Sequence, residues 1–162
     1  MGHDLVCLRE GRNPVITLDG HTWVTFDDAL VGPWVCERAG LKYAPERFTG
    51  IGRIKDGQIV AGVLYEDCNG ASVYCHIAGE GNWANKHFLW LIFDYPFNQL
   101  GVRRITTTVC PNNVRSQKFT ARLGFEVEAK LKDAHPEGDI WVFRMFKENC
   151  RWIEAKDAIQ HV

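Results

Sequence analysis

The chain has 162 residues, of which 46% are hydrophobic, and a formal net charge of −1 at pH 7. This length fits a single domain over residues 1–162 with a real buried core, and the near-zero charge argues against general nucleic-acid binding. No apolar run approaches the length that spans a bilayer and the first residues lack a signal-peptide pattern, so we expect a cytoplasmic protein with no membrane segment.

The cysteines are widely spaced and form no Cys-x-x-Cys pair: Cys7, Cys36, Cys68, Cys75, Cys110 and Cys150. In a chain without a secretory signal, this pattern favours buried, reduced thiols over disulfides. The dipeptide Cys75-His76 follows Cys68, but the spacing of a metal site is missing. We therefore expect no metal.

The first quarter of the chain predicts a hairpin and a helix. Two candidate strands flank the turn dipeptide Asp19-Gly20, at Val15 to Leu18 and at Thr22 to Phe26. Asp27 or Asp28 is a suitable N-cap for a helix that runs to Ala39 and stops at Gly40. The dipeptide Gly32-Pro33 would break or kink this helix.

Period-two alternation begins after Phe48 and predicts three antiparallel strands. They cover Ile51 to Lys55, Gln58 to Glu66 and Ala71 to Ile77. The dipeptides Asp56-Gly57 and Asn69-Gly70 are strong hairpin signals between them. A meander of this kind needs helices to cover at least one of its faces.

A long apolar segment, Trp83 to Tyr95, predicts a buried helix that Pro96 ends or kinks. The β-branched run Ile105 to Val109 predicts the next strand. Asn112 or Asn113 would cap a second helix. This helix closes at Gly124 and turns four residues inward: Ser116, Phe119, Thr120 and Leu123.

The last strands are predicted at Phe125 to Lys132 and Ile140 to Phe146. Between them, Asp133 to Gly138 has the length of a mobile loop that walls a site. Residues 147–162 predict a helical tail. This tail either folds back on the sheet or packs against a second subunit, so a homodimer is one alternative.

Glycines stand at the mouth of the first apolar helix, in the loop Ala78-Gly79-Glu80-Gly81-Asn82. The unpaired N–H groups and partial positive charge of a helix start suit a phosphate, although a lone Gly-x-Gly is also common in plain turns. Basic residues are frequent between Gly101 and Lys132: Arg103, Arg104, Arg115, Lys118, Arg122, Lys130 and Lys132. They form a solvated helix face, a site for anionic phosphates, or both.

A spaced pattern follows the strand that ends at Pro111: Asn113, Ser116, Leu123, Gly124 and Phe125. With further segments at Tyr95 to Gly101, Arg103 to Thr107 and Asp139 to Met145, the sequence resembles the GNAT superfamily of acetyl-CoA-dependent N-acetyltransferases. It looks most like the branch of ribosomal-protein and N-terminal alanine or serine acetyltransferases, and like some GNAT-like phage proteins. The resemblance implies an α/β (α+β) fold, with a mixed, mostly antiparallel sheet of six to seven strands flanked by about four helices.

The resemblance also implies acetyl-CoA as co-substrate and an amine as acceptor. The implied CoA-binding residues are Ile77, Ala78, Gly81, Asn82, Trp83, Ala84, Asn85 and Lys86, followed by Asn113, Ser116 and Phe119. In the favoured alignment of the family's phosphate-binding motif with this sequence, Gly81 to Lys86 form the start of the helix. Alignment by the glycines instead places the phosphate motif on His76, Gly79 and Gly81, and alignment from Tyr95 places it on Glu80 to Asn85.

Acetyl transfer needs a neutral amine, and several side chains are candidate bases. His76 has the right class of pKa, about 6.5 in an unperturbed histidine, and Glu66 is the alternative. Glu80 could also act through a water molecule. Thr120 departs from the family, because many GNAT enzymes carry at this position a tyrosine that reprotonates the leaving thiolate.

The resemblance therefore implies an N-acetyltransferase that acts by direct attack in a ternary complex, on a protein N-terminus or a small-molecule amine. The alternative is a GNAT-fold binding or assembly protein, including one encoded by a phage, that has lost catalysis. Thr120 and the altered glycine loop favour this alternative, whereas Asn113, Ser116 and the basic surroundings favour the enzyme. A Rossmann-type nucleotide-binding protein fits less well, because hairpins precede the loop.

Overall fold

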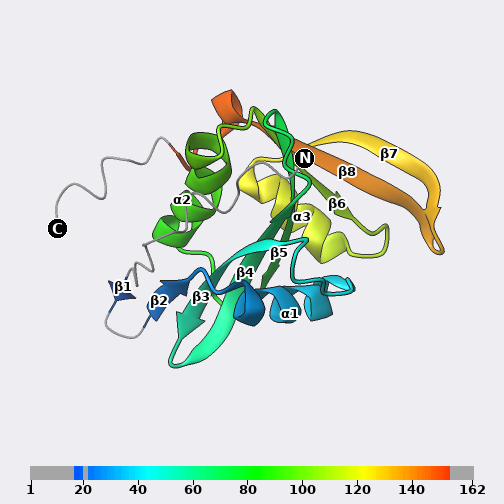
Figure 1. Ribbon diagram of the computed structural model, residues 1–162. Helices are drawn as coiled ribbons and strands as arrows, with labels where there is room; N and C mark the ends of the chain where they lie inside the picture. Colours follow the sequence, from blue (N-terminus) through cyan, green and yellow to red (C-terminus); the bar gives the residue numbers. More distant parts are fainter. Residues whose placement is uncertain (1–16, 20–21, 154–162) are drawn as a thin grey trace. The chain divides into compact units, whose positions relative to one another are not determined.

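The structure is a computed structural model that describes residues 17–19 and 22–153 (Figure 1). The chain forms two compact units. The first comprises the residues up to Asp67 together with His76–Ile92, and the second comprises Cys68–Cys75 together with the residues from Phe93 onward. Strand β5 (Ser72–Gly79) contributes residues 72–75 to the second unit and residues 76–79 to the first.

The first four strands of the first unit are antiparallel neighbours in chain order. They are β1 (Thr17–Asp19), β2 (Thr22–Thr25), β3 (Thr49–Lys55) and β4 (Gln58–Glu66). Asp56 and Gly57 join β3 to β4 with φ angles of 50° and 77°, as a two-residue hairpin turn requires. The predicted pairing of the first two strands is confirmed, although Val15, Ile16 and Gly20 lie outside the described residues.

Helix α1 (Asp28–Ala39) begins and ends where the sequence predicts. The Asp27 side chain accepts a hydrogen bond from the backbone N–H of Ala29 at 3.0 Å, and Gly40 ends the helix with a φ of 68°. Pro33 lies inside the helix and does not break it.

Three glycines of β3 and β4 let α1 lie close against these strands: Gly50, Gly52 and Gly62. A Cβ on Gly52 would lie 2.6 Å from a Val31 methyl group, and a Cβ on Gly62 would lie 2.5 Å from a Val35 methyl group. Because no real Cβ tolerates such distances, the absence of side chains at these positions is what allows Val31 and Val35 to be fully buried.

Helix α2 (Lys86–Asp94) starts three residues later than predicted, because Asn85 and not Trp83 stands at its mouth. The Asn85 side chain accepts a hydrogen bond from the backbone N–H of Phe88 at 2.8 Å. The predicted apolar face is confirmed, since Phe88, Leu91 and Ile92 are buried. The α-helix ends before Pro96, which lies in the π-helix η1 (Tyr95–Gln99).

In the second unit, β5 pairs in parallel with β6 (Arg104–Val109), and β6 pairs antiparallel with β8 (Gly138–Phe146). Strand β7 (Glu126–His135) pairs with β8 and is the last strand in the sheet order. Ser72, Arg104 and Phe146 are register partners across three strands, so their side chains share one face of the sheet.

Helix α3 (Val114–Leu123) follows β6, with Asn113 as its N-cap and Gly124 as its end. Its buried face consists of Gln117, Thr120 and Leu123, while the predicted inward residues Ser116 and Phe119 are half-buried. Gln117 was not among the predicted inward residues, and its side-chain amide donates to the carbonyl oxygens of Cys110 at 3.0 Å and Pro111 at 3.1 Å. This amide ties the helix to the segment that follows β6.

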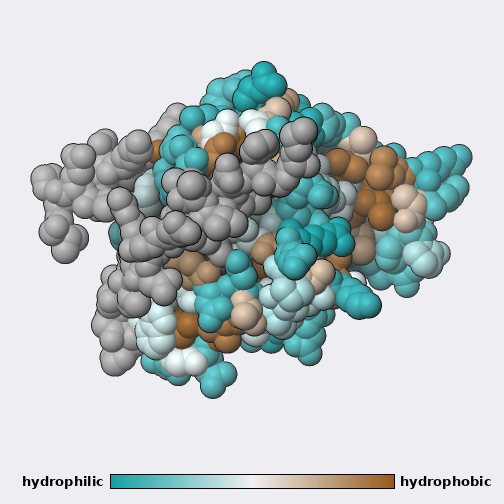
Figure 2. All heavy atoms as spheres, in the orientation of Figure 1, coloured by the Kyte–Doolittle hydropathy of each residue, from teal (hydrophilic) through white to brown (hydrophobic). Residues whose placement is uncertain are grey.

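The prediction of a mobile loop over Asp133 to Gly138 is wrong. Strand β7 continues to His135, which pairs with Gly138, so only residues 136 and 137 form the turn. Asp133 has a φ of 53° at a shift in register, which marks a bulge. Val127 and Leu131 of β7 are 45% and 48% exposed, and Figure 2 shows apolar residues gathered on this hairpin, at the right of the view.

Across the described residues there are eight strands, three α-helices, the π-helix and the short 3-10 helix η2 (Lys147–Asn149). Strand β5 pairs in parallel with β6, whereas the pairings of β1 with β2, β2 with β3, β3 with β4, β6 with β8 and β7 with β8 are antiparallel. This confirms the predicted α/β (α+β) class with a mixed, mostly antiparallel sheet. Residues 154–162 of the predicted tail lie outside the described part. No helix in the described ranges is long and apolar enough to cross a membrane.

Candidate active site

The first unit brings the two predicted bases His76 and Glu66 into direct contact. His76 Nε2 lies 2.6 Å from Glu66 Oε1, and Glu66 Oε2 accepts a hydrogen bond from Arg47. The side chains of Glu66 and His76 are 4% and 12% exposed. A carboxylate that accepts from Nε2–H favours the neutral tautomer whose lone pair is on Nδ1. Glu66 therefore orients the His76 ring.

The neighbouring thiols are poor nucleophiles. Burial, and next the charge of Glu66, raise the pKa of the Cys36 thiol. Burial raises the pKa of Cys75, in the second unit, to about 12. Because thiolate is the reactive form, neither residue suits a covalent acyl intermediate. Both are free, buried thiols as predicted, whereas Cys110 is exposed and Cys7 lies outside the described residues.

The loop between β5 and α2 is built around a buried tryptophan. Trp83 is 8% exposed, and its side chain covers Gly79. A Cβ on Gly79 would lie 2.1 Å from the indole Nε1. Arg53 of β3 donates a hydrogen bond to the backbone carbonyl oxygen of Trp83. Gly81 has a φ of 62°, a left-handed conformation that favours glycine. Only a few conformations of the loop satisfy these contacts together.

Glu80, the third candidate base, is held at the surface of this loop. Its backbone N–H donates to the carbonyl oxygen of Val60 at 2.8 Å, and its carboxylate pairs with Arg38 at 2.6 Å. The Glu80 side chain is 58% exposed. This ion pair anchors the loop to α1.

The predicted CoA-binding residues of the first unit differ in accessibility. Gly81, Asn82 and Lys86 are exposed, Ile77, Ala78, Ala84 and Asn85 are half-buried, and Trp83 is buried. Exposed backbone at a helix start can meet an anion directly. Trp83 instead contributes to the support of the loop.

In the second unit, the predicted residues lie in the first turns of α3. The Asn113 side chain accepts a hydrogen bond from the backbone N–H of Ser116 at 3.0 Å. Asn113 is exposed, Ser116 and Phe119 are half-buried, and Thr120 is 6% exposed. Thr120 is thus part of the buried face that holds the helix in place.

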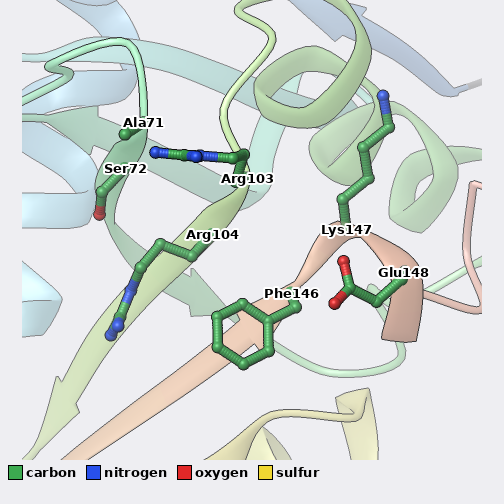
Figure 3. A pocket seen from close by; sticks show the side chains of 7 residues that line it. All are labelled: Ala71, Ser72, Arg103, Arg104, Phe146, Lys147 and Glu148. Carbon is green, nitrogen blue, oxygen red and sulfur yellow. The ribbon is translucent and has the colours of Figure 1, made fainter.

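Two cavities have linings that contain neither His76 nor Glu66. The second unit has a cavity of about 700 Å³, lined by Ala71, Ser72, Arg103, Arg104, Phe146, Lys147 and Glu148. Figure 3 shows Arg104 pointing along its strand and away from Lys147, consistent with its hydrogen bond to Glu128 at 3.1 Å. The first unit has a cavity of about 490 Å³ beside α1, with Leu30, Trp34 and Ile59 in its lining. Neither lining carries a histidine or a cysteine, so neither cavity offers a base of neutral pKa or a thiol nucleophile.

Within the described ranges, no group of three His, Cys, Asp or Glu side chains is arranged to hold a metal ion. The site chemistry available from these residues is that of a half-buried imidazole, oriented by a carboxylate, on a strand that leads into a glycine-containing loop at the start of a helix.

No family model matches the sequence, and no curated protein matches it. Solved structures match the fold. The ribosomal-protein-S5-alanine acetyltransferase of Vibrio fischeri aligns with a TM-score of 0.59 and 16% identity over 84% of this chain and 97% of that chain. The dodecameric spermidine N-acetyltransferase of Vibrio cholerae aligns with a TM-score of 0.55 and 15% identity over 63% and 66%.

The Campylobacter jejuni N-acetyltransferase PseH, solved in complex with acetyl coenzyme A, aligns with a TM-score of 0.50 and 16% identity over 62% of this chain and 69% of that chain. Another match is described as an acetyltransferase of the GNAT family from Bacillus anthracis, with a TM-score of 0.53 and 14% identity over 61% and 66%. The chain therefore has the fold of the GNAT acetyltransferases, as the sequence resemblance implied.

Proposed function

We propose that the protein is an N-acetyltransferase that moves an acetyl group from acetyl-CoA to a primary amine. The observation that carries this proposal is the contact of the half-buried His76 with the buried Glu66, 2.6 Å apart, on the strands beside the glycine-containing loop at the start of α2. The GNAT fold supports it, because the matched structures are acetyltransferases by description.

In this proposal the loop before α2 binds the anionic end of acetyl-CoA. Gly81, Asn82 and Lys86 are exposed, and the partial positive charge of the helix start favours a pyrophosphate. Ala84 and Asn85 complete the helix mouth, and Ile77 and Ala78 of β5 contact the pantetheine arm. Following the resemblance, we also assign Asn113, Ser116 and Phe119 of α3 to CoA binding.

His76 would act as the general base. The lone pair on Nδ1 takes a proton from the ammonium form of the acceptor, while Glu66 stabilises the imidazolium that forms. The neutral amine then attacks the thioester carbonyl, so that a C–N bond forms and the C–S bond breaks. The tetrahedral intermediate gives the second proton of the amine to solvent as it collapses, and CoA departs as a thiolate that takes a proton from solvent. His76 then returns its own proton to solvent.

The acceptor we propose is a protein N-terminus or a small-molecule amine. Matched structures are described as acetyltransferases of ribosomal protein S5 alanine and of spermidine, which represent these two classes. An α-amine, with an ordinary pKa of about 7.7–8.0, requires less of the base than a lysine with a pKa of about 10.4.

A second candidate function is a GNAT-fold binding protein without catalysis. Thr120 favours this candidate, because it stands where many GNAT enzymes carry an acidic tyrosine. Thr120 is also only 6% exposed. However, a thiol with an ordinary pKa of about 8.5 leaves as thiolate near neutral pH, so Thr120 does not by itself prevent turnover.

Calorimetric titration with acetyl-CoA, desulfo-CoA and ATP tests the co-substrate. We expect both CoA compounds to bind and ATP not to bind. A panel of peptides and polyamines, with thiol release as the readout, then tests transfer. Binding without amine-dependent thiol release would support the binding protein, and no binding of either CoA compound would overturn the acetyltransferase.

A further inference from the structure

Arg53 is a buried arginine in an unusual setting. It lies on β3, it is 6% exposed, and no ion pair with a carboxylate is found for it among the described residues. A guanidinium remains charged in proteins, and a buried charge without a counter-charge is costly. The residue therefore needs an explanation beyond packing.

Among the described residues, the hydrogen bonds of Arg53 go to the loop that precedes α2. Its Nη1 donates to the carbonyl oxygen of Trp83 and lies 3.5 Å from that of Asn82. Its Nε is buried and has no hydrogen-bond partner in the described part of the chain. Arg53 thus holds two successive carbonyl groups of the loop on the side that faces β3.

This arrangement has a consequence for the other side of the same loop. Peptide carbonyls that are fixed toward Arg53 limit how the loop can rotate, while Gly81 and Asn82 remain exposed. The positive charge beneath the loop adds to that of the α2 N-terminus, in a setting that water screens weakly. Both effects favour an anion over the loop.

We propose that Arg53 is a positioning residue for the pyrophosphate of the co-substrate. It acts through the loop, by fixing its carbonyl groups and by supplying the buried charge for which the ligand is the counter-charge. This inference rests on the proposed acetyltransferase function. In this inference Arg53 affects the binding of the pyrophosphate, and it neither holds the pantetheine arm nor takes part in the chemistry.

The test compares two ligands that differ in the pyrophosphate. Acetyl-CoA has the pyrophosphate and S-acetylpantetheine lacks it. We expect Arg53→Met to raise the dissociation constant for acetyl-CoA by about tenfold or more, and that for S-acetylpantetheine by less than about twofold, in NMR titrations. Arg53→Lys should recover part of the loss, because it keeps the charge. Lys55→Met, which removes an exposed positive charge from the same strand β3, is the matched control and should change neither constant.

The outcomes are distinct. If wild-type protein binds neither ligand, the acetyltransferase proposal fails and this inference fails with it. If wild type binds both and Arg53→Met weakens both equally, or neither, only the role of Arg53 is overturned. Should Arg53→Met not fold, Arg53→Lys decides alone: a selective loss of several-fold for acetyl-CoA supports the inference. Equal dissociation constants of wild type and Arg53→Lys for acetyl-CoA contradict it.

Discussion

The helix starts at Asn85 and Asn113 use the same cap in different surroundings. Each asparagine side chain accepts a backbone hydrogen bond from three residues ahead, at 2.8 Å from Phe88 and at 3.0 Å from Ser116. Phe88 is fully buried, and the loop before Asn85 is held by buried contacts. Asn113, in contrast, is exposed.

This difference shows how much of each region is fixed by folding. In the first unit, the proposed base and the proposed phosphate loop are supported by buried polar contacts, so changes there should affect function and stability together. At the start of α3, water can replace a lost hydrogen bond, so substitutions should affect ligand binding with little cost to the fold. The predictions below test this contrast.

The largest predicted effect separates chemistry from binding. His76→Gln keeps an amide that can donate to Glu66 but removes the base, so turnover should fall about 10²–10⁴-fold with unchanged affinity for acetyl-CoA. Ser116→Trp should instead weaken acetyl-CoA binding, because a large side chain would fill the proposed pantetheine path. Initial rates of thiol release and calorimetric affinities measure both. Full turnover in His76→Gln would exclude His76 as the base, and unchanged affinity in Ser116→Trp would remove α3 from the site.

The next prediction concerns the loop that covers Gly79. Gly79→Ala places a Cβ 2.1 Å from the Trp83 indole, and overpacking of this kind costs about 1–3 kcal/mol. Gly81→Ala is the matched variant, since open space surrounds its Cβ position and only its φ of 62° opposes the substitution, at roughly 1 kcal/mol. Urea denaturation gives both free energies of unfolding. A smaller loss for Gly79→Ala than for Gly81→Ala would show that Trp83 moves easily.

Local signals explain which parts of this fold the sequence predicts. The hairpin turn at Asp56-Gly57 and the caps of α1 and α3 are set by a few adjacent residues, and the structure has them where expected. The fold class follows from the order of these elements. The close approach of α1 to its strands could be suspected from the three glycines, but only the strand register places Gly52 opposite Gly62.

Tertiary contacts explain the failures. Trp83 continues the apolar pattern of α2, but its indole packs over Gly79 outside the helix. A bulge at Asp133 carries β7 through residues with a loop-like composition. The contact of His76 with Glu66 was not anticipated, although both residues were candidates. No sequence signal marks Arg53, because nothing local distinguishes an arginine that will be buried beneath a loop.

The two caps provide a direct comparison. Asn85→Ala leaves the N–H of a fully buried residue, Phe88, without its partner, so we expect a loss of about 2 kcal/mol. Asn113→Ala leaves the N–H of Ser116, which water can reach, so about 0.5–1 kcal/mol is expected. Chemical denaturation of both variants under identical conditions measures the difference. Equal losses would mean that the start of α2 is as accessible to water as that of α3.

The smallest predicted effect lies in an exposed ion pair of the second unit. A hydrogen bond from Arg104 lowers the pKa of the Glu128 carboxyl group, whose side chain is 37% exposed. Because the folded pKa is below the ordinary value of 4.5, the pair contributes stability above that value and loses it as pH falls through the folded pKa. Solvent screens an exposed pair, so this contribution should be smaller than either cap and should fall further with added salt.

Glu128→Gln tests this pair, with Glu137→Gln at the nearby hairpin turn as the control. The unfolding free energies of wild type and Glu128→Gln should differ slightly at neutral pH and converge as the pH falls below the lowered folded pKa of Glu128, where the carboxyl group is protonated in both folded and unfolded protein. The control should show no such convergence. If Glu128→Gln lowered the free energy of unfolding as much as Asn85→Ala does, and if added salt did not reduce this loss, the proposed difference between the two units would be wrong. Such a result would show that the exposed face of the second unit is held by polar contacts as firmly as the buried loop of the first.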